Sequence, residues 1–297
     1  MKIILIGSKG QLGEELYNKF INIDNIELIC WDRKDIDFIY TEAIYYKLLT
    51  ICPNIVINAV AYTDVDQAEK NIELTYKINY ESVKSIVRYI KDTKSLLVHF
   101  SSDYVFDGKK NTRYREYDYT NPLNIYGHSK LAADLYIINS SCNSLIFRTS
   151  WIFSAKGRNF LKKILELSTI KETIQVVDDQ YGSPLSAKAI AEITVNAIMN
   201  LYQKNGVEIY NISINNIINR YDLAILFLKK IKQKLFNIKC NKIISIKSDF
   251  HSGAIRPKHS YLLENKKINE LSNNLPSFNN CLNETIEEII SHSKRIS

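Results

Sequence analysis

A tyrosine and a lysine four positions apart, Tyr126 and Lys130, are the residues of this chain best suited to proton transfer. On a helix, positions i and i+4 lie on one face a turn apart, so both side chains can point into the same site. A nearby cation favours the phenolate, which makes the phenol a better proton donor to a carbonyl oxygen, or a base toward an alcohol in reverse. The chain has 19 tyrosines, so the spacing alone is weak, and a surface helix with a packed tyrosine is the alternative.

A glycine-rich turn near the N-terminus gives this pair a context. Residues 2–6 are apolar and β-branched, as in a buried parallel strand, and a turn and a helical apolar pattern follow at once. The turn has the spacing GxxGxxG, in which glycines allow a tight bend, approach of the backbone to a pyrophosphate and close helix–strand packing. The helix N-terminus then faces the phosphates. We expect a dinucleotide to contact Gly7, Gly10, Gln11, Leu12 and Gly13.

The end of the second expected strand, residues 26–31, carries opposite charges at Asp32 and Arg33. An acidic side chain about twenty residues past the glycine turn can bind the adenosine ribose hydroxyls, whereas an arginine can meet a 2′-phosphate. The pair leaves the choice between NADH and NADPH open. The other residues expected along the cofactor follow the second and third strands and are Asp37, Phe38, Ala61, Tyr62 and Thr63.

Ser102 follows the fourth expected strand, residues 95–100. Ligands of open α/β sheets bind at the carboxyl ends of the strands, so this hydroxyl should lie near the cofactor. A serine after a strand often only caps the loop, but the YxxxK pair downstream makes a catalytic role for Ser102 a hypothesis. The polar segment 109–123 is expected to be an exposed segment over the site.

Strands and helices alternate through the first half of the chain, which predicts an α/β fold with a Rossmann-type, doubly wound parallel sheet. Further strands are expected at 55–60, 144–148 and 209–213, and helices at 66–89, 187–202 and 221–236. We expect residues 1–150 to form the dinucleotide-binding domain with the YxxxK pair. Residues 151–297 should form mainly a smaller substrate-binding lobe, interleaved with the first because no linker separates them.

Bulk composition narrows the class of protein. The 297 residues are 45% hydrophobic, enough for a sizeable core, and the net charge of +7 is not gathered into long runs. An anionic small molecule is therefore favoured over nucleic acid as a partner. The five cysteines are widely spaced without a CxxC, which fits reduced thiols. No run resembles a signal peptide or a membrane span, so we expect a soluble, cytoplasmic protein without a membrane partner.

Seven blocks of the sequence together carry a family resemblance. They are Gly10-Gln11-Leu12-Gly13, Val56-Ile57-Asn58-Ala59 running to Asp66-Gln67-Ala68-Glu69, Ser101 to Gly108, Tyr126 to Ala132, Arg148-Thr149-Ser150-Trp151, Asp179 to Pro184 and Arg256-Pro257-Lys258. With these blocks the chain resembles the extended short-chain dehydrogenases/reductases that act on nucleotide sugars and, among them, the dTDP-4-dehydrorhamnose reductase family. The resemblance extends from residue 3 to about residue 262, most of the chain.

The resemblance implies reduction of the C4 ketone of dTDP-4-dehydro-β-L-rhamnose to dTDP-L-rhamnose by NADPH or NADH. It makes Tyr126 the proton donor to the C4 oxygen. Lys130 would hold the nicotinamide ribose and lower the pKa of the phenol, and Ser102 would donate a hydrogen bond to the same oxygen. The implied substrate contacts are Asp103, Trp151 and Arg256, with Arg256 and Lys258 as candidates for the diphosphate.

Two departures from the family pattern stand beside this resemblance. The family usually has threonine where this chain has Ser102, and alanine where it has Val60; neither change removes a catalytic group. Some members pair as homodimers around Mg²⁺ held by glutamates. Here Glu192, Glu287 and Glu288 could hold Mg²⁺ at a dimer interface, but solvated helix-surface glutamates also explain them, so no metal is claimed and a monomer or homodimer is expected.

Two other functions remain open from the sequence. An epimerase or dehydratase of the same superfamily would take and return the hydride without net oxidation of the cofactor. A non-catalytic, NADP-binding regulatory subunit, resembling the β subunit of methionine adenosyltransferase, would keep the fold for binding. The presence of Ser102, Tyr126 and Lys130 argues against the second of these.

Overall fold

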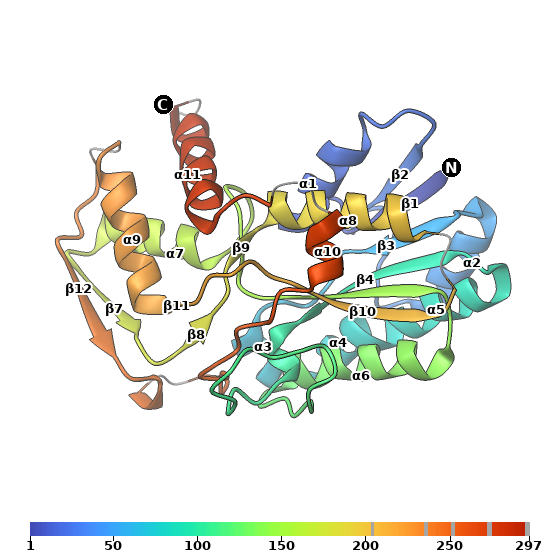
Figure 1. Cartoon of the computed structure of the whole chain (residues 1–297), viewed down its shortest axis with the longest axis horizontal. Coiled ribbons are helices and arrows are strands. Elements are labelled where there is room, and N and C mark those ends of the chain that lie inside the picture. The colour runs from blue at the N-terminus through green and yellow to red at the C-terminus, as the bar shows by residue number, and fades with distance from the viewer. Residues whose placement is uncertain (203–204, 235–236, 251–252, 272–274, 295–297) are drawn as a thin grey trace.

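A computed structural model of the chain describes residues 1–202, 205–234, 237–250, 253–271 and 275–294. A large parallel sheet with flanking helices forms one side of the molecule, and a smaller lobe of helices and short strands forms the other (Figure 1). The N-terminus lies in the large sheet and the C-terminal helix lies over the smaller lobe.

The large sheet has six strands in the order β10-β5-β4-β3-β1-β2, all paired in parallel. Their bounds are β1 (Lys2–Ile6), β2 (Glu27–Trp31), β3 (Ile55–Asn58), β4 (Leu96–Ser102), β5 (Ser144–Thr149) and β10 (Val207–Ile212). The order reverses between β1 and β3, as in a doubly wound sheet, and this confirms the predicted fold class. The last strand comes from the second half of the chain, so the two halves share one sheet.

Successive side chains of each strand point to opposite faces of the sheet and so pack into two separate hydrophobic cores. Ile3 and Leu5 face the core covered by α1 (Gln11–Phe20) and α8 (Ala187–Leu201). Ile4 and Ile6 face the opposite core, covered by α2 (Thr41–Ile51), α5 (Ser82–Thr93) and α6 (Ile125–Ser140). Helices on both faces explain why the strands are apolar throughout rather than amphipathic.

The helix expected at 66–89 is broken into several pieces. It consists of α3 (Val65–Lys70), α4 (Ile72–Tyr76), a π-helical turn at Lys77–Glu81 and then α5. The π turn holds the buried Asn79, whose side-chain oxygen Oδ1 accepts from the Tyr62 backbone N–H at 2.7 Å. Its amide donates to the Ser129 hydroxyl at 2.8 Å, so the irregular turn ties the loop after β3 to α6.

The smaller lobe is built around α7 (Phe160–Ile170) and α9 (Arg220–Lys232). Its other elements are β6 (Ile152–Phe153), β7 (Thr173–Val177), β8 (Tyr181–Gly182), β9 (Leu185–Ser186), β11 (Ile218–Asn219), β12 (Lys242–Ile246) and α11 (Phe278–Lys294). The short helix α10 (Lys266–Leu271) instead packs on α8, beside the large sheet (Figure 1). The helix predicted at 221–236 ends at Lys232, and the last two predicted residues lie outside the described ranges.

The segment 109–123 differs from the exposed loop that the sequence predicts. Tyr114 is 3% exposed, stacks on Phe106 with ring centroids 4.3 Å apart and bridges to Leu262. Tyr117 and Tyr119, by contrast, are 83% and 84% exposed. The segment is therefore anchored at its middle by an aromatic contact and exposed beyond it.

The closest backbone approach in the glycine turn lies between Gly13 and Gly7. A Cβ on Gly13 would stand 2.0 Å from the Gly7 carbonyl oxygen, whereas one on Gly10 would stand 3.3 Å from the same atom. We expect Gly13→Ala to lower the free energy of unfolding by about 1–3 kcal/mol, the usual cost of overpacking, despite the better helix propensity of alanine. Urea unfolding measures it. Gly10→Ala is the matched control and should cost less; equal losses for the two variants would contradict this account.

Candidate active site

Ser102 and Tyr126 come together at the carboxyl end of β4. Ser102 is the last residue of that strand, and Tyr126 lies in the first turn of α6, whose N-cap Asn124 accepts from the Gly127 N–H at 2.8 Å. The Ser102 hydroxyl lies close enough to the phenol to favour the phenolate. Burial is the larger effect and raises the pKa of the Tyr126 phenol well above its usual value, so the phenol is held protonated.

Lys130 lies one turn after Tyr126 and is 1% exposed. Its ammonium donates to the Phe100 carbonyl oxygen at 2.6 Å and lies 3.3 Å from Nε2 of His99. Burial lowers the pKa of Lys130 to about 8, with Asp134 opposing. The ammonium is turned toward the strand, and burial dominates at the phenol, so the lowering of the phenol pKa by Lys130 stays a prediction.

Asp103 follows Ser102 in a short 3₁₀ turn and is 2% exposed. Its carboxylate accepts from the Ser102 and Ser150 hydroxyls, both at 3.0 Å. Burial outweighs these hydrogen bonds and raises the pKa of Asp103 to about 6. The carboxyl can therefore change its protonation state near neutral pH, beside the paired hydroxyls.

The glycine turn has the shape that a pyrophosphate requires. Gly7 has a φ of +84° and Gly10 is the N-cap of α1, with no side chain capping the helix. The amide groups of the first helical turn are therefore left to an outside acceptor, which suits a phosphate. Leu12 is buried in the core beneath the turn.

Gln11 connects the glycine turn to the smaller lobe. Its side chain accepts from Ser154 at 3.1 Å and Asn159 at 2.8 Å, and donates to the Arg158 carbonyl oxygen at 2.9 Å. Sequence reasoning placed Gln11 against the cofactor, whereas the structure places its amide in a bridge between the two lobes.

The carboxylate of Asp32 already has partners within the protein. Lys9, from the glycine turn, forms an ion pair with its carboxylate, which also accepts from the Lys34 N–H at 2.6 Å. These contacts lower the pKa of Asp32. Asp37 closes a local turn by accepting from the Ile39 N–H at 3.0 Å, and Phe38 is 6% exposed in the core.

The loop after β3 brings Ala61, Tyr62 and Thr63 to the same edge of the sheet. Ala61 and Tyr62 are half-buried and Thr63 is exposed. Because Asn79 holds the Tyr62 backbone, this loop has a fixed position beside α6.

Trp151 is half-buried at the start of the smaller lobe, where its backbone has a φ of +45°. It lies flat against Gly182, on which a Cβ would stand 2.5 Å from the indole ring. The Arg220 guanidinium stacks over the same ring, 3.5 Å from its centroid. Trp151 is therefore held between β8 and the first residue of α9, within the smaller lobe.

Arg256 and Lys258, the expected diphosphate ligands, both form ion pairs. Arg256 pairs with Asp66 at 2.8 Å. Lys258 pairs with Asp179 at 3.2 Å and with Asp249 at 3.7 Å. Their positive charges are thus already compensated by carboxylates.

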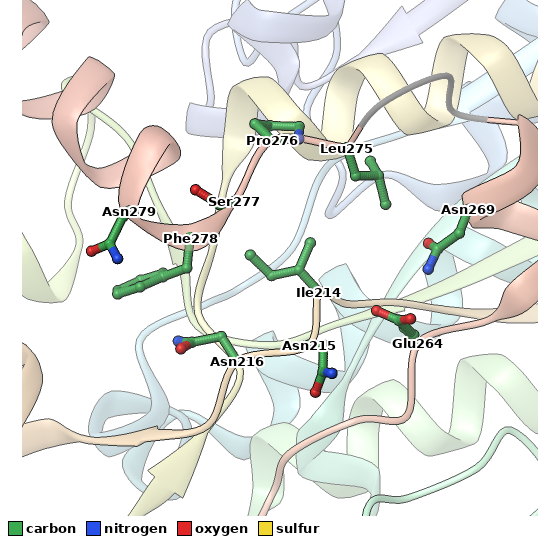
Figure 2. Close-up of a pocket in the computed structure, with 10 residues that line it drawn as sticks. All are labelled: Ile214, Asn215, Asn216, Glu264, Asn269, Leu275, Pro276, Ser277, Phe278 and Asn279. Atoms are coloured by element: carbon green, nitrogen blue, oxygen red, sulfur yellow. The ribbon is translucent and has the colours of Figure 1, made fainter.

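A cavity of about 500 Å³ lies elsewhere, between the β10–β11 and α10–α11 connections (Figure 2). Its lining is Ile214, Asn215, Asn216, Glu264, Asn269, Leu275, Pro276, Ser277, Phe278 and Asn279, none of which is a predicted site residue. Within the described ranges, no group of three or more His, Cys, Asp or Glu side chains could hold a metal ion. No helix in that part of the chain is long and apolar enough to cross a bilayer.

Sequence reasoning missed three residues that shape the site. In the sequence, His99 stands out only as a polar residue within an apolar strand. Asn79 stands out only as an asparagine within a segment with the pattern of an amphipathic helix. Arg220 has no local signal, because only the folding of the second half brings it to Trp151.

Because folding raises the pKa of Asp103, the free energy of unfolding should depend on pH. Because folding raises this pKa from 3.8 to about 6, the contribution to stability is fully present below about pH 3.8 and is lost as the pH rises through about 6. At about 1.4 kcal/mol per pKa unit, wild type should lose about 3 kcal/mol relative to Asp103→Asn across that range. Urea unfolding of both proteins at several pH values measures this loss. Parallel pH curves for the two proteins would contradict the buried-carboxyl account.

Comparison with known proteins places these features in a family. The sequence model described as RmlD substrate binding domain matches residues 1–291. The dTDP-4-dehydrorhamnose reductase of Escherichia coli K12 is 32% identical over 275 residues, covering 91% of each chain. The Bacillus anthracis enzyme of that name, solved in complex with NADP, superposes with a TM-score of 0.86 at 28% identity, covering 97% of this chain and 99% of the other.

A more distant structure shares the fold alone. The UDP-Glc/GlcNAc 4-epimerase of Campylobacter jejuni superposes with a TM-score of 0.79 at 14% identity and covers 99% of both chains. The family model and the curated relatives agree with the resemblance carried by the sequence blocks. The chain belongs to the dTDP-4-dehydrorhamnose reductase family.

Proposed function

We propose that the protein reduces the C4 ketone of dTDP-4-dehydro-β-L-rhamnose to dTDP-L-rhamnose with a nicotinamide cofactor. The observation that carries this proposal is the placement of the half-buried Tyr126 beside the buried Ser102 at the carboxyl end of β4, in a sheet whose glycine turn suits a dinucleotide. The names of the curated relatives support the same reaction and substrate.

Tyr126, Ser102 and Lys130 have different roles in the protonation of the C4 oxygen. The nicotinamide supplies a hydride to C4, and Tyr126 gives its phenol proton to the C4 oxygen as negative charge develops there. Ser102 donates a hydrogen bond to the same oxygen. Lys130, with a pKa of about 8, can exchange a proton at neutral pH. Asp103 and Trp151 face the sugar from the two lobes.

Two further assignments follow from this reaction. We assign cofactor binding to residues 1–150 and most of the substrate contacts to residues 151–297, although β10 returns to the first sheet. We also propose a cytoplasmic location, because all five cysteines are free thiols and the reaction consumes a reduced nicotinamide.

The surroundings of Asp32 bear on the cofactor. Lys9 and the Lys34 N–H already occupy its carboxylate, which would otherwise bind ribose hydroxyls. Lys9 and the exposed Arg33 add positive charge at the same place. We infer a preference for NADPH, whose 2′-phosphate would meet Lys9.

Tyr126→Phe tests the proposed reaction. Loss of the phenol proton should lower kcat by about 10²- to 10⁴-fold while NADP⁺ binding persists. The measurement is NADPH absorbance with the 4-keto sugar nucleotide. Net NADPH oxidation separates a reductase from an epimerase or dehydratase, and purified wild type that binds cofactor without any turnover would favour a regulatory subunit.

Lys9→Ala tests the cofactor preference. Freed from Lys9, Asp32 should disfavour a 2′-phosphate, so the ratio of NADP⁺ to NAD⁺ affinity should fall by about 3- to 10-fold, a modest loss because the pair is exposed. Calorimetric titration with both dinucleotides measures the ratio. Lys171→Ala, an exposed lysine of the smaller lobe, should leave it unchanged. The inference fails if Lys9→Ala behaves like that control.

A further inference from the structure

Arg220 is placed at the site by a chain of backbone contacts from the smaller lobe. β11 pairs with β8, which sets Asn219 opposite Tyr181. Asn219 then caps α9 by accepting from the Asp222 N–H at 2.7 Å, and the Arg220 N–H donates to the Gln180 carbonyl oxygen at 3.2 Å. As the first residue of α9, Arg220 has a backbone position fixed on both sides.

The guanidinium of Arg220 is held by aromatic groups. Its Cζ lies 3.5 Å from the Trp151 ring centroid and 4.8 Å from that of Phe160. The Tyr104 phenol lies close enough to the guanidinium to raise its pKa. The Tyr104 ring in turn meets the Tyr126 ring edge to face, with centroids 5.8 Å apart. Arg220 is therefore one aromatic ring away from the proton donor.

The charge of Arg220 is compensated differently from the charges of its basic neighbours. Arg256 and Lys258 form ion pairs with carboxylates, whereas none of the ion pairs within the described ranges includes Arg220. Burial is the main influence that lowers the pKa of Arg220, with Asp103 and Tyr104 opposing it. A half-buried guanidinium without a paired carboxylate is costly and creates a strong site for an external anion.

We propose that Arg220 binds the diphosphate of the sugar nucleotide, the role that sequence reasoning gave to Arg256 and Lys258. This inference rests on the proposed function and names its substrate contact. A planar guanidinium fork fits phosphate oxygens, and stacking on Trp151 presents it in a fixed orientation. In a pyranose the C1 diphosphate lies across the ring from the C4 ketone. That separation matches an anion site one aromatic ring from Tyr126.

Calorimetric titration with dTDP and with thymidine tests the inference without turnover. Arg220→Gln should weaken dTDP binding by about 10- to 100-fold, the range of a lost charge-assisted contact, and leave thymidine binding unchanged. Arg220→Lys keeps the charge without the fork and should lose less. Arg88→Gln, which removes a surface charge paired with Glu42, is the matched control and should bind dTDP like wild type. Circular dichroism establishes that each variant is folded.

Kinetics with the 4-keto sugar nucleotide separate this inference from the proposed function. Arg220→Gln should raise KM for the sugar nucleotide more than it lowers kcat. Unchanged dTDP affinity in the folded Arg220→Gln variant overturns the inference and leaves the reductase assignment standing. Weakened dTDP binding in a protein whose wild type reduces no ketone supports Arg220 as the diphosphate site and overturns the reductase assignment.

Discussion

Burial of ionisable groups at the carboxyl end of β4 is the constraint from which the chemistry of this site follows. It raises the pKa of the Tyr126 phenol, raises that of Asp103 to about 6 and lowers that of Lys130 to about 8. Each shift favours the uncharged form, as expected where water is excluded. A phenol held neutral suits reduction of a ketone, in which the enzyme must give a proton rather than take one.

The positive charge of the buried Lys130 is partly compensated by a second buried residue, Asp134, farther along α6. Asp134, one turn beyond Lys130, is fully buried and pairs with Arg148 of β5 at 3.2 Å. Its carboxylate also accepts from Ser101 at 2.8 Å, and its charge raises the pKa of Lys130 against the effect of burial. Without Asp134 the lysine would be more nearly neutral at physiological pH. The ion pair between Asp134 of α6 and Arg148 of β5 therefore both joins the helix to the sheet and influences the protonation of Lys130.

The parts of the protein that local sequence can specify were predicted well. The strands of the large sheet are short, apolar and bounded by turns, so their positions follow from periodicity, and the glycine turn follows from its spacing. Contacts between distant segments could not be predicted in this way. The bridge from Gln11 to Asn159, the ion pair of Arg256 with Asp66 and the stacking of Arg220 on Trp151 all depend on how the second half folds onto the first. The π turn at Asn79 was missed because its helical periodicity is nearly regular.

The serine at position 102 shows how local hydrogen bonds can replace a steric restraint. The threonine usual in the family has a methyl group that limits its χ1 rotamer, and serine lacks it. Here the Ser102 hydroxyl accepts from the Tyr104 N–H at 3.1 Å and donates to Asp103 at 3.0 Å. Both partners lie in the 3₁₀ turn that follows, so they fix the hydroxyl from one side. The direction of the hydroxyl then depends on the protonation of Asp103, because a protonated carboxyl can donate to the serine oxygen and free the serine proton for the substrate. Substrate polarisation by Ser102 and titration of Asp103 are thereby coupled, a dependence that a threonine held by its own methyl group would show less strongly.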